Sequence, residues 1–237
     1  MEQKVSIIIP TFNESENIRD FISELIKSIG RPLHEIIVVD DNSPDGTWKV
    51  VERLGKRNRK IMLVRRINER GLPSAIATGI RKATGGIIVW LDSDFSHPPG
   101  LIPKMLKYFP AYDVVSASRY VKGGEDRRDL TRIMTSKMLN ILGNFVLRIH
   151  VKDITSGFYA AKKKVFDKVK LKEDGYAEYC IKFSFDALKS GFKWKEIPYK
   201  FRDRAKGTSK SVGSVTNFLN NGYLCVKEII LLRIGRH

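Results

Sequence analysis

The sequence predicts an α/β protein with a mostly parallel central sheet flanked by helices. Short apolar runs alternate along the chain with longer segments whose apolar residues recur at helical spacing, the signature of repeated β-α-β units. The run Ile87–Leu91 is apolar throughout and lies between a glycine pair and a proline pair, as expected of a strand buried on both faces. With 237 residues, the chain suffices for one large domain, or a domain with an appendage.

The individual elements follow from the apolar pattern. Strands are expected at residues 5–10, 35–40, 61–64, 87–91 and 113–118, in a short segment after Gly157, and at 193–199. Helices are expected at residues 18–29, 47–54, 72–83, 130–149, 175–189 and 211–232. Gly30 and Gly191 follow two of these helices, in a position that glycine favours.

The charge balance is strongly basic. The chain carries 43 lysine and arginine residues against 26 aspartate and glutamate residues, a formal net charge of +17. This favours anionic partners such as phosphates, membrane surfaces or nucleic acid. Cys180 and Cys225 fit no metal-binding or redox spacing, which favours a reducing, cytosolic setting. No window approaches the roughly 18 apolar residues of a membrane span, so membrane contact is expected to be peripheral or through a partner.

Acidic residues follow successive strands. Neither GxGxxG nor GxxxxGK[ST] follows the first strand, which argues against a dinucleotide fold and a P-loop enzyme. Instead Glu14 follows the first strand, Asp40 and Asp41 the second, and Asp92 and Asp94 the fourth. Because open α/β sheets bind ligands at the carboxyl ends of their strands, these carboxylates suit ribose hydroxyls, base N–H donors and a metal.

Asp92 and Asp94 are candidate metal ligands. On a continuing strand their side chains would share one face, and Mg²⁺ and Mn²⁺ prefer oxygen ligands. The alternative is that both aspartates merely cap a helix expected to begin near Pro98 and Pro99.

A basic segment follows the last strand. Residues 200–210 hold one acid, Asp203, and five basic residues: Lys200, Arg202, Arg204, Lys206 and Lys210. The segment is either a solvated loop or a mobile lid that places arginine and lysine on a diphosphate.

The carboxy-terminal residues 211–237 form an expected amphipathic helix. It is too polar to span a bilayer, and it either packs on the domain or a partner or lies in a membrane interface. Arg233, Arg236 and His237 would suit anionic headgroups.

Seven blocks, in order, resemble the family 2 glycosyltransferases, and among them the polyprenol (dolichol) phosphate mannose synthases. The blocks are SIIIPTFNESENI (6–18), IIVVDDNSPDGT (36–47), GLPSAIATGIRKATG (71–85), LDSDFSHPP (91–99), ASRYVKGG (117–124), DITSGFYA (153–160) and RAKGTSK (204–210). The resemblance implies a Rossmann-like A-type glycosyltransferase fold and mannose transfer from GDP-mannose to a polyprenol phosphate, with Mn²⁺ or Mg²⁺.

The resemblance also implies an organisation. Residues 1–210 would form the catalytic domain, with a nucleotide-sugar-binding half at 1–97 and an acceptor-binding half at 98–210. The protein would be cytoplasmic and peripheral on the cytoplasmic face of a membrane, held there by residues 211–237 or by a separate membrane anchor subunit.

Site residues are implied by the same resemblance. Nucleotide-sugar contacts would come from Pro10, Phe12, Glu14, Val39, Asp41, Asp92, Ser93 and Asp94, and from Arg204, Lys206 and Lys210 in a loop that closes on the donor phosphates. Asp92, Asp94 and Ser96 would hold the metal, although members commonly carry glutamine where this chain has Ser96. Arg119, Arg132 and Ser136 would bind the acceptor phosphate. The catalytic residues would be Asp92, Asp94, Arg119 and Arg132.

The expected mechanism needs no catalytic base, because the second pKa of a phosphate monoester is about 6 and the nucleophile is already largely dianionic. In-line displacement predicts inversion. The alternative within this chemistry is a UDP-glucose-dependent polyprenol phosphate glucosyltransferase. A nucleotidyltransferase would want a basic, glycine-rich loop where TFNESEN is acidic, and a nucleic-acid binder, suggested only by the charge, would not need Asp92.

Overall fold

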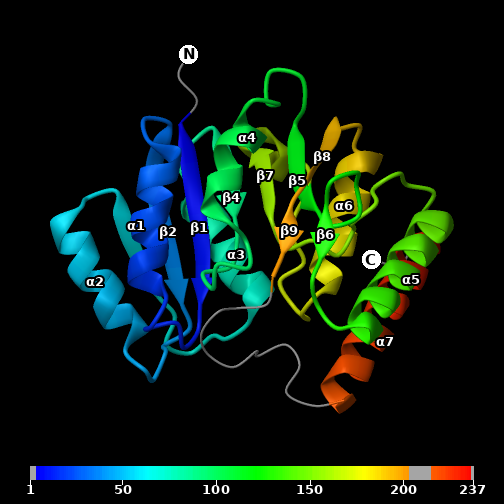
Figure 1. Cartoon of the computed structure of the whole chain (residues 1–237), viewed down its shortest axis with the longest axis horizontal. Helices are drawn as coiled ribbons and strands as arrows, with labels where there is room; N and C mark the ends of the chain where they lie inside the picture. The colour runs from blue at the N-terminus through cyan, green and yellow to red at the C-terminus, as the bar shows by residue number, and fades with distance from the viewer. Residues whose placement is uncertain (1–3, 203–214, 236–237) are drawn as a thin grey trace.

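The computed structural model of the chain describes residues 4–202 and 215–235. A seven-stranded sheet forms the middle layer, with helices on both of its faces (Figure 1). Its strand order is β3-β2-β1-β4-β7-β5-β8. Strand β7 runs antiparallel to both of its neighbours, β4 and β5, whereas the other pairs in the sheet are parallel. The predicted mostly parallel sheet is therefore confirmed.

The strands lie where the apolar runs predicted them. The strands of the large sheet are β1 (Val5–Thr11), β2 (Leu33–Asp40), β3 (Ile61–Arg65), β4 (Ile87–Trp90), β5 (Val114–Ser118), β7 (Tyr159–Lys162) and β8 (Trp194–Pro198). A separate two-stranded sheet pairs β6 (Glu125–Asp126) with β9 (Lys200–Phe201) in parallel.

The helices also follow their predicted order. The α-helices are α1 (Ile18–Ile29), α2 (Thr47–Arg57), α3 (Leu72–Lys82), α4 (Ile102–Leu106), α5 (Leu130–Leu147), α6 (Glu178–Lys189) and α7 (Val215–Arg233). Two short 3₁₀ helices, η1 (Pro99–Leu101) and η2 (Lys163–Asp167), complete the described elements. In the described part of the chain, no helix is both long and apolar enough to cross a bilayer.

Alternate residues of the central strands enter opposite layers. On β1, Ile7 and Ile9 pack with α1, α2 and α4, whereas Ile8 packs with α3 and the α6 side. Because both faces are covered, the central strands are buried at nearly every position.

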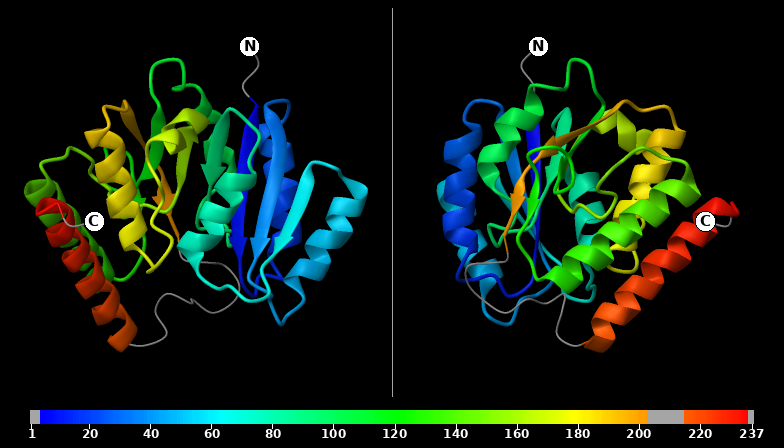
Figure 2. Two further views of the ribbon diagram at one scale, coloured as in Figure 1. Left: turned by 180° about the vertical axis from the view of Figure 1, so that it is seen from behind. Right: turned by 45° about the vertical axis from the view of Figure 1, so that its right-hand side comes forward.

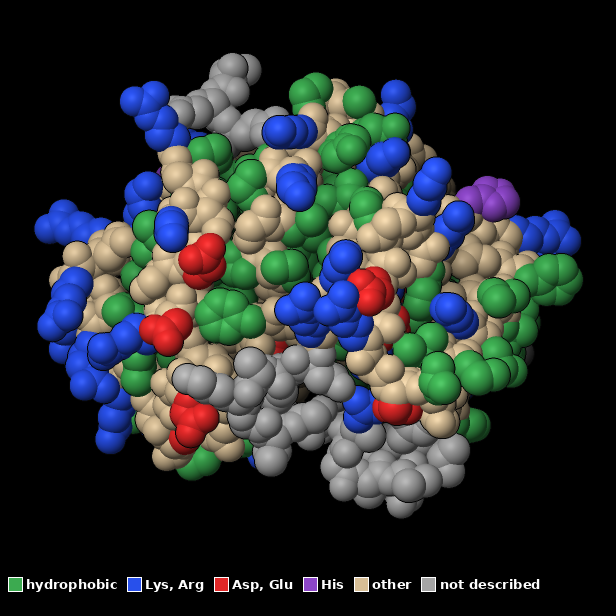
Figure 3. Space-filling model, viewed as in Figure 1, with side chains coloured by type: hydrophobic (Ala, Val, Ile, Leu, Met, Phe, Trp, Pro, Cys, Tyr) green, Lys and Arg blue, Asp and Glu red, His purple; other side chains and the backbone are tan. Residues whose placement is uncertain are grey.

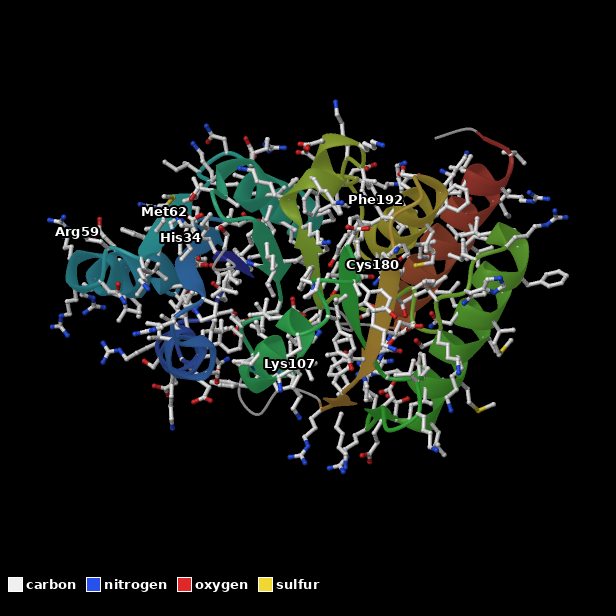
Figure 4. All side chains as sticks on the ribbon, turned by 90° about the horizontal axis from the view of Figure 1, so that it is seen from above. His34, Arg59, Met62, Lys107, Cys180 and Phe192 are labelled. Atoms are coloured by element: carbon white, nitrogen blue, oxygen red, sulfur yellow. The ribbon has the colours of Figure 1, made fainter. Side chains whose placement is uncertain are left out.

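A third apolar cluster joins α5, α6 and α7 at the β8 end of the sheet. Its buried members include Leu147 on α5, Ile181 on α6 and Ile229 on α7. Figure 2 shows α5 and α7 side by side at that end of the molecule. Cys180 of α6 lies inside the molecule in Figure 4, and it is buried and free, as is Cys225 of α7.

Two local expectations are wrong. Strand β4 ends at Trp90, and a bend with Phe95 in the left-handed region (φ 64°) follows, so strand alternation does not orient Asp92 and Asp94. Lys200 and Phe201, expected in the basic loop, form β9 because their backbone pairs with Glu125 and Asp126.

Candidate active site

An open cavity of about 650 Å³ lies at the carboxyl ends of β1, β2 and β4. The β1 end, the bend after β4, the start of α3, the loop after β5, helix α5 and α7 all contribute to its wall. The wall includes Pro10, Phe12, Glu14, Asp41, Arg70, Asp92, Ser93, Asp94, Ser96, His97, Arg119, Arg128, Arg132, Ser136, Thr155, Tyr179, Gly222 and Cys225. The cavity therefore joins acidic strand ends to an arginine-rich wall.

The bend after β4 supplies two carboxylates in different settings. The Asp92 side chain is 46 % exposed, whereas Asp94 is buried. Oδ1 of Asp94 accepts hydrogen bonds from the Ser96 hydroxyl at 2.6 Å and the Ser96 backbone N–H at 3.0 Å. These bonds hold the Asp94 carboxylate in one orientation at the cavity wall.

His97 holds the same bend in place. The backbone N–H of Asp92 donates to Nδ1 of His97 at 3.0 Å, so this nitrogen is the acceptor and Nε2 carries the ring proton of the neutral imidazole. The ring stacks on Phe158 with centroids 5.2 Å apart and is almost fully buried. The 3.8 Å approach of Nδ1 to Asp92 Oδ2 is therefore not a charge pair.

The donor set of this bend fits a magnesium or manganese ion. Both ions prefer oxygen ligands and are often held by one or two carboxylates together with substrate phosphates. Asp92 and Asp94 supply two carboxylates, and Ser96 a hydroxyl, beside the cavity. Within residues 4–202 and 215–235, no group of three or more His, Cys, Asp and Glu side chains is placed so that it could hold a metal ion.

The β2 end of the cavity is a rigid ion-pair cluster. Asp41 Oδ1 accepts from Arg66 Nε at 2.7 Å and lies 2.6 Å from Arg66 Nη2, while Oδ2 accepts from the Gly71 N–H at 2.8 Å. Arg66 also donates to the Gly71 carbonyl and to Ser74. These bonds position the loop that carries Arg70, whose guanidinium lies 3.8 Å from the Phe12 ring centroid.

Glu14 is held at the end of β1 by the neighbouring turn. Its backbone N–H donates to the Thr47 hydroxyl, and its Oε2 accepts from Asn17 at 3.0 Å. The buried carboxylate therefore has a defined direction in the cavity wall.

Arginines dominate the opposite wall. Arg119 donates from Nε and Nη2 to Asp153 and from Nη2 to Thr155. Burial lowers the pKa of Arg119, but the Asp153 carboxylate outweighs it and holds the pKa well above its usual value. The guanidinium of Arg128 donates two hydrogen bonds to the Asp126 carboxylate, at 2.9 and 2.6 Å.

Helix α5 adds a third arginine to this wall. The Asp129 side chain caps the helix by accepting from the Arg132 N–H, and Arg132 Nε lies 3.2 Å from Asp129 Oδ2. One turn later, the Ser136 hydroxyl lies 3.5 Å from the Thr155 hydroxyl. Arg119, Arg132 and Ser136, which are distant in sequence, thus line one wall.

Most sequence-predicted site residues share the cavity. The residues that line it are Pro10, Phe12, Glu14, Asp41, Asp92, Ser93, Asp94, Ser96, Arg119, Arg132 and Ser136. Val39 does not, because its side chain is fully buried against the α3 layer. Arg204, Lys206 and Lys210 lie outside the described residues.

Arg70, His97, Arg128 and Thr155 also line the wall, although no motif in the sequence singled them out. His97 lies inside the block LDSDFSHPP and Thr155 inside DITSGFYA, so the blocks themselves were the available signal. Arg128 lies in a charged segment without a distinctive pattern, and only the fold brings it to the cavity.

Comparison with known proteins identifies related sequences. A family model described as "Glycosyl transferase family 2" matches residues 6–170. Dolichol-phosphate mannosyltransferase from Pyrococcus furiosus is 36% identical over 232 residues, which cover 94% of this chain and 64% of that protein. Polyprenol monophosphomannose synthase from Mycolicibacterium smegmatis is 33% identical over 221 residues, which cover 90% of this chain and 82% of that protein. The chain thus spans less than two thirds of the Pyrococcus relative.

Solved structures share the fold. A crystal structure of glucosyl-3-phosphoglycerate synthase from Mycobacterium tuberculosis, in complex with Mn²⁺, UDP and phosphoglyceric acid, has a TM-score of 0.73 at 17% identity. The similarity covers 98% of this chain and 79% of that one. A second complex of that enzyme, with Mg²⁺ and UDP, also gives 0.73 at 16% identity, covering 98% of this chain and 80% of that one. The likeness confirms the predicted A-type glycosyltransferase fold.

Proposed function

Because this chain belongs to glycosyl transferase family 2, we propose that it transfers mannose from GDP-mannose to a polyprenol (dolichol) phosphate. The observation that supports this most is that the wall of one cavity holds Asp92 and Asp94 together with Arg119, Arg132 and Ser136. Carboxylates suit a metal–diphosphate donor, and arginines suit a phosphate acceptor. The names of the two relatives support mannose and a polyprenol phosphate as the substrates.

The donor nucleoside lies at the β1 and β2 ends in this proposal. Pro10, Phe12, Glu14 and Asp41 line that part of the cavity, whereas the Val39 side chain is buried in the core and contributes no contact to the nucleoside. Arg204, Lys206 and Lys210, which lie outside the described residues, are proposed as contacts to the donor phosphates.

Asp92, Asp94 and Ser96 hold Mn²⁺ or Mg²⁺ in this proposal, together with the phosphates of the donor. When bound, the ion neutralises negative charge on the departing diphosphate. Ser96 already donates to Asp94, so its hydroxyl acts mainly by orienting that carboxylate.

The acceptor phosphate is the nucleophile. One of its oxygens forms the bond to the anomeric carbon of mannose, while the bond from that carbon to the diphosphate breaks and GDP leaves. No proton has to be removed first, because the second pKa of a phosphate monoester is about 6. Arg132 and Ser136 hold the acceptor phosphate in line with the bond that breaks. Asp153 holds Arg119 in position on the same wall. Displacement from the opposite side inverts an α-linked donor sugar to a β-linked product.

The polyprenol chain places the reaction at a membrane. We propose that the protein works there as a peripheral enzyme on the cytoplasmic face, alone or with a membrane anchor subunit.

The test is transfer of radiolabelled sugar to polyprenol phosphate with Mn²⁺, comparing GDP-mannose and UDP-glucose. Lipid-soluble label from GDP-mannose, lost in Asp94→Asn but retained in the control Asp20→Asn on the exposed side of α1, supports the proposal. Label only from UDP-glucose contradicts mannose as the sugar and favours a glucosyltransferase. No label from either donor, with an active control enzyme in the same lipid, means that a partner subunit is required or that the acceptor assignment is wrong.

A further inference from the structure

The segment 151–155 runs from one cleft of the molecule to another. Val151 contributes to the wall of a second open cleft, of about 880 Å³, whereas Thr155 contributes to the wall of the candidate active-site cavity. Between them, Asp153 is fully buried, and its carboxylate accepts from Nε and Nη2 of Arg119. A shift of this segment would therefore move a guanidinium of the arginine-rich wall.

Glu196 of β8 binds the backbone of this segment. Its Oε2 accepts the Lys152 N–H at 2.8 Å, and its Oε1 accepts the Asp153 N–H at 3.0 Å. Glu196 lines the second cleft, and it is not among the described residues that line the active-site cavity. Both oxygens of one carboxylate thus fix two consecutive backbone groups from outside the cavity.

Glu196 makes these two bonds in basic surroundings. Lysine and arginine side chains are spread over the face of the molecule that Figure 3 shows, and Arg148, Lys189 and Lys195 share the wall of the second cleft with Glu196. Hydrogen bonds from N–H groups to a carboxylate are among the strong ones in proteins. Because backbone N–H groups cannot swing away as a lysine side chain can, the two bonds also fix the direction of the main chain.

The other end of the segment contacts α5. The Thr155 hydroxyl accepts from Arg119 Nη2 at 2.8 Å and lies 3.5 Å from the Ser136 hydroxyl. The Ile154 N–H donates to Oδ1 of Asn140, also on α5, at 2.7 Å. The segment therefore fixes Arg119 relative to Ser136.

We propose that Glu196 is a positioning residue for the acceptor phosphate. By holding the backbone of Lys152 and Asp153, it sets the place of the Asp153 carboxylate and, through it, of the Arg119 guanidinium. Glu196 itself touches no substrate. This role rests on the proposed function, since the acceptor phosphate is the ligand proposed for Arg119. A small displacement of a group that positions a substrate can cost a large part of its effect.

Glu196→Gln tests the proposal with almost no change in shape. An amide has one oxygen that accepts an N–H and a nitrogen that cannot, so one bond is lost and a donor faces a donor. Glu35→Gln is the matched control, because Glu35 also accepts a backbone N–H, that of Thr84, but lies near the amino end of β2. Thermal unfolding checks that both variants fold.

The kinetic test measures KM for each substrate. We expect Glu196→Gln to raise KM for polyprenol phosphate about tenfold and to leave KM for GDP-mannose unchanged, and Glu35→Gln to change neither. In Arg119→Lys, which already loses the paired bonds to Asp153, adding Glu196→Gln should raise the acceptor KM no further, because both act through one contact. Glu196→Asp keeps the charge on a shorter side chain and should have an intermediate effect. It carries the test if Glu196→Gln does not fold.

Hydrogen exchange of the main chain gives a measurement that does not depend on the reaction. The Arg119 N–H donates to Asp153 Oδ2 at 2.9 Å, so its exchange rate reports whether Asp153 is in place. We expect Glu196→Gln to speed exchange of the Arg119 N–H about tenfold and Glu35→Gln to leave it unchanged.

An unchanged acceptor KM in folded Glu196→Gln overturns the proposal, as does an equal rise in both KM values or the same rise in Glu35→Gln. If the wild-type protein transfers no sugar to polyprenol phosphate, the proposed function fails, and hydrogen exchange still decides the link. Faster exchange at Arg119 in Glu196→Gln then supports the positioning of Arg119 by Glu196, and unchanged exchange overturns it.

Discussion

Arg119 and Asp153 form a buried, two-pronged ion pair at the arginine wall of the cavity. Arg119 Nε donates to Asp153 Oδ2 at 2.8 Å, Nη2 donates to Oδ1 at 2.6 Å, and the Arg119 backbone N–H also donates to Oδ2 at 2.9 Å. The pair ties the segment after β5 to the segment before β7. Asp153 therefore positions Arg119, whereas the carboxylate beside Arg132 on α5, that of Asp129, is 56% exposed.

Asp153→Asn should deprive the buried Arg119 guanidinium of its closest carboxylate and leave it only Asp126, which lies 3.7 Å from Nη1 and also pairs with Arg128. We expect the free energy of unfolding to fall by about 3 kcal/mol, since breaking a buried pair from one side is strongly destabilising. Urea unfolding measures this change. Asp129→Asn is the control, because that side chain is 56% exposed and its loss should cost less than about 1 kcal/mol. An equal loss of unfolding free energy in the two variants would show that the Arg119–Asp153 pair stabilises the fold no more than the exposed Asp129 does.

Arg132→Ala should raise KM for the polyprenol phosphate about tenfold or more and leave KM for the donor nearly unchanged. Arg132→Lys should recover only part of the loss, because an ammonium cannot form the planar fork. Steady-state kinetics with each substrate varied in turn measure both effects. Arg127→Ala is the matched control, since Arg127 is 41% exposed, pairs with Glu125 and is not among the cavity residues. A larger effect on the KM for the donor would contradict the assignment of Arg132 to the acceptor phosphate.

Arg66→Met should weaken nucleotide binding indirectly. Arg66 is buried against Asp41 and also holds Gly71, so its loss leaves the carboxylate without its cation and releases the Arg70 loop. We expect the affinity for GDP, measured by calorimetry, to fall about tenfold, and stability to fall by about 2 to 4 kcal/mol. Arg65→Met removes an exposed arginine that stacks on Trp48 and should change neither quantity. Unchanged GDP affinity in Arg66→Met would show that the Asp41–Arg66 cluster does not contribute to nucleotide binding.

Asp94→Asn should reduce sugar transfer about a hundredfold or more and weaken Mn²⁺ binding in the presence of GDP. Ser96→Ala removes the 2.6 Å bond to Asp94 and should have a smaller effect, about threefold to tenfold, chiefly on the metal concentration for half-maximal rate. Metal titrations of rate and of Mn²⁺ paramagnetic resonance measure these changes. EDTA should abolish transfer and added Mn²⁺ restore it. Full activity in EDTA would exclude the metal role of the bend.

Asp113 should make stability depend on pH in acid. Burial raises its pKa, but hydrogen bonds from Lys164, from the backbone of Lys193 and from Lys162 outweigh burial and lower it from 3.8 to about 2. Because the pKa is lower in the folded protein, the stabilisation is complete above about pH 4 and is lost as the pH falls towards 2. Asp113→Asn should therefore cost about 1 kcal/mol at neutral pH and progressively less below pH 4, as measured by urea unfolding. A difference that stays constant with pH would show that ionisation of Asp113 does not contribute.

The sequence alone determined the order and type of the strands of the large sheet and of the long helices. Apolar runs such as Ile87–Trp90 and helical periodicity such as that of Ile18–Ile29 are local signals, so each was readable without knowing its partners. The acidic residues after the strands were equally visible in the sequence. Because the carboxyl ends of parallel strands meet at one edge of the sheet, the sequence also predicted that these residues lie close together.

The tertiary structure decided which groups meet. Strand β7 enters the sheet between β4 and β5 in the opposite direction, and nothing in its four residues encodes that position. Asp92 and Asp94 reach the cavity from a bend rather than from a strand, because β4 ends at Trp90. The 34-residue separation of Arg119 from Asp153 closes only when β5 and β7 pair.

The exposed apolar side chains of α5 show the same division. The periodic pattern of residues 130–147 predicted a helix, but the pattern could not say which apolar side chains would be buried. Burial depends on the neighbours that the fold brings to each face. Here α6 and α7 cover Leu147 and leave Ile141 and Phe145 exposed, because the apolar surface of α5 is wider than the surface its neighbours can cover.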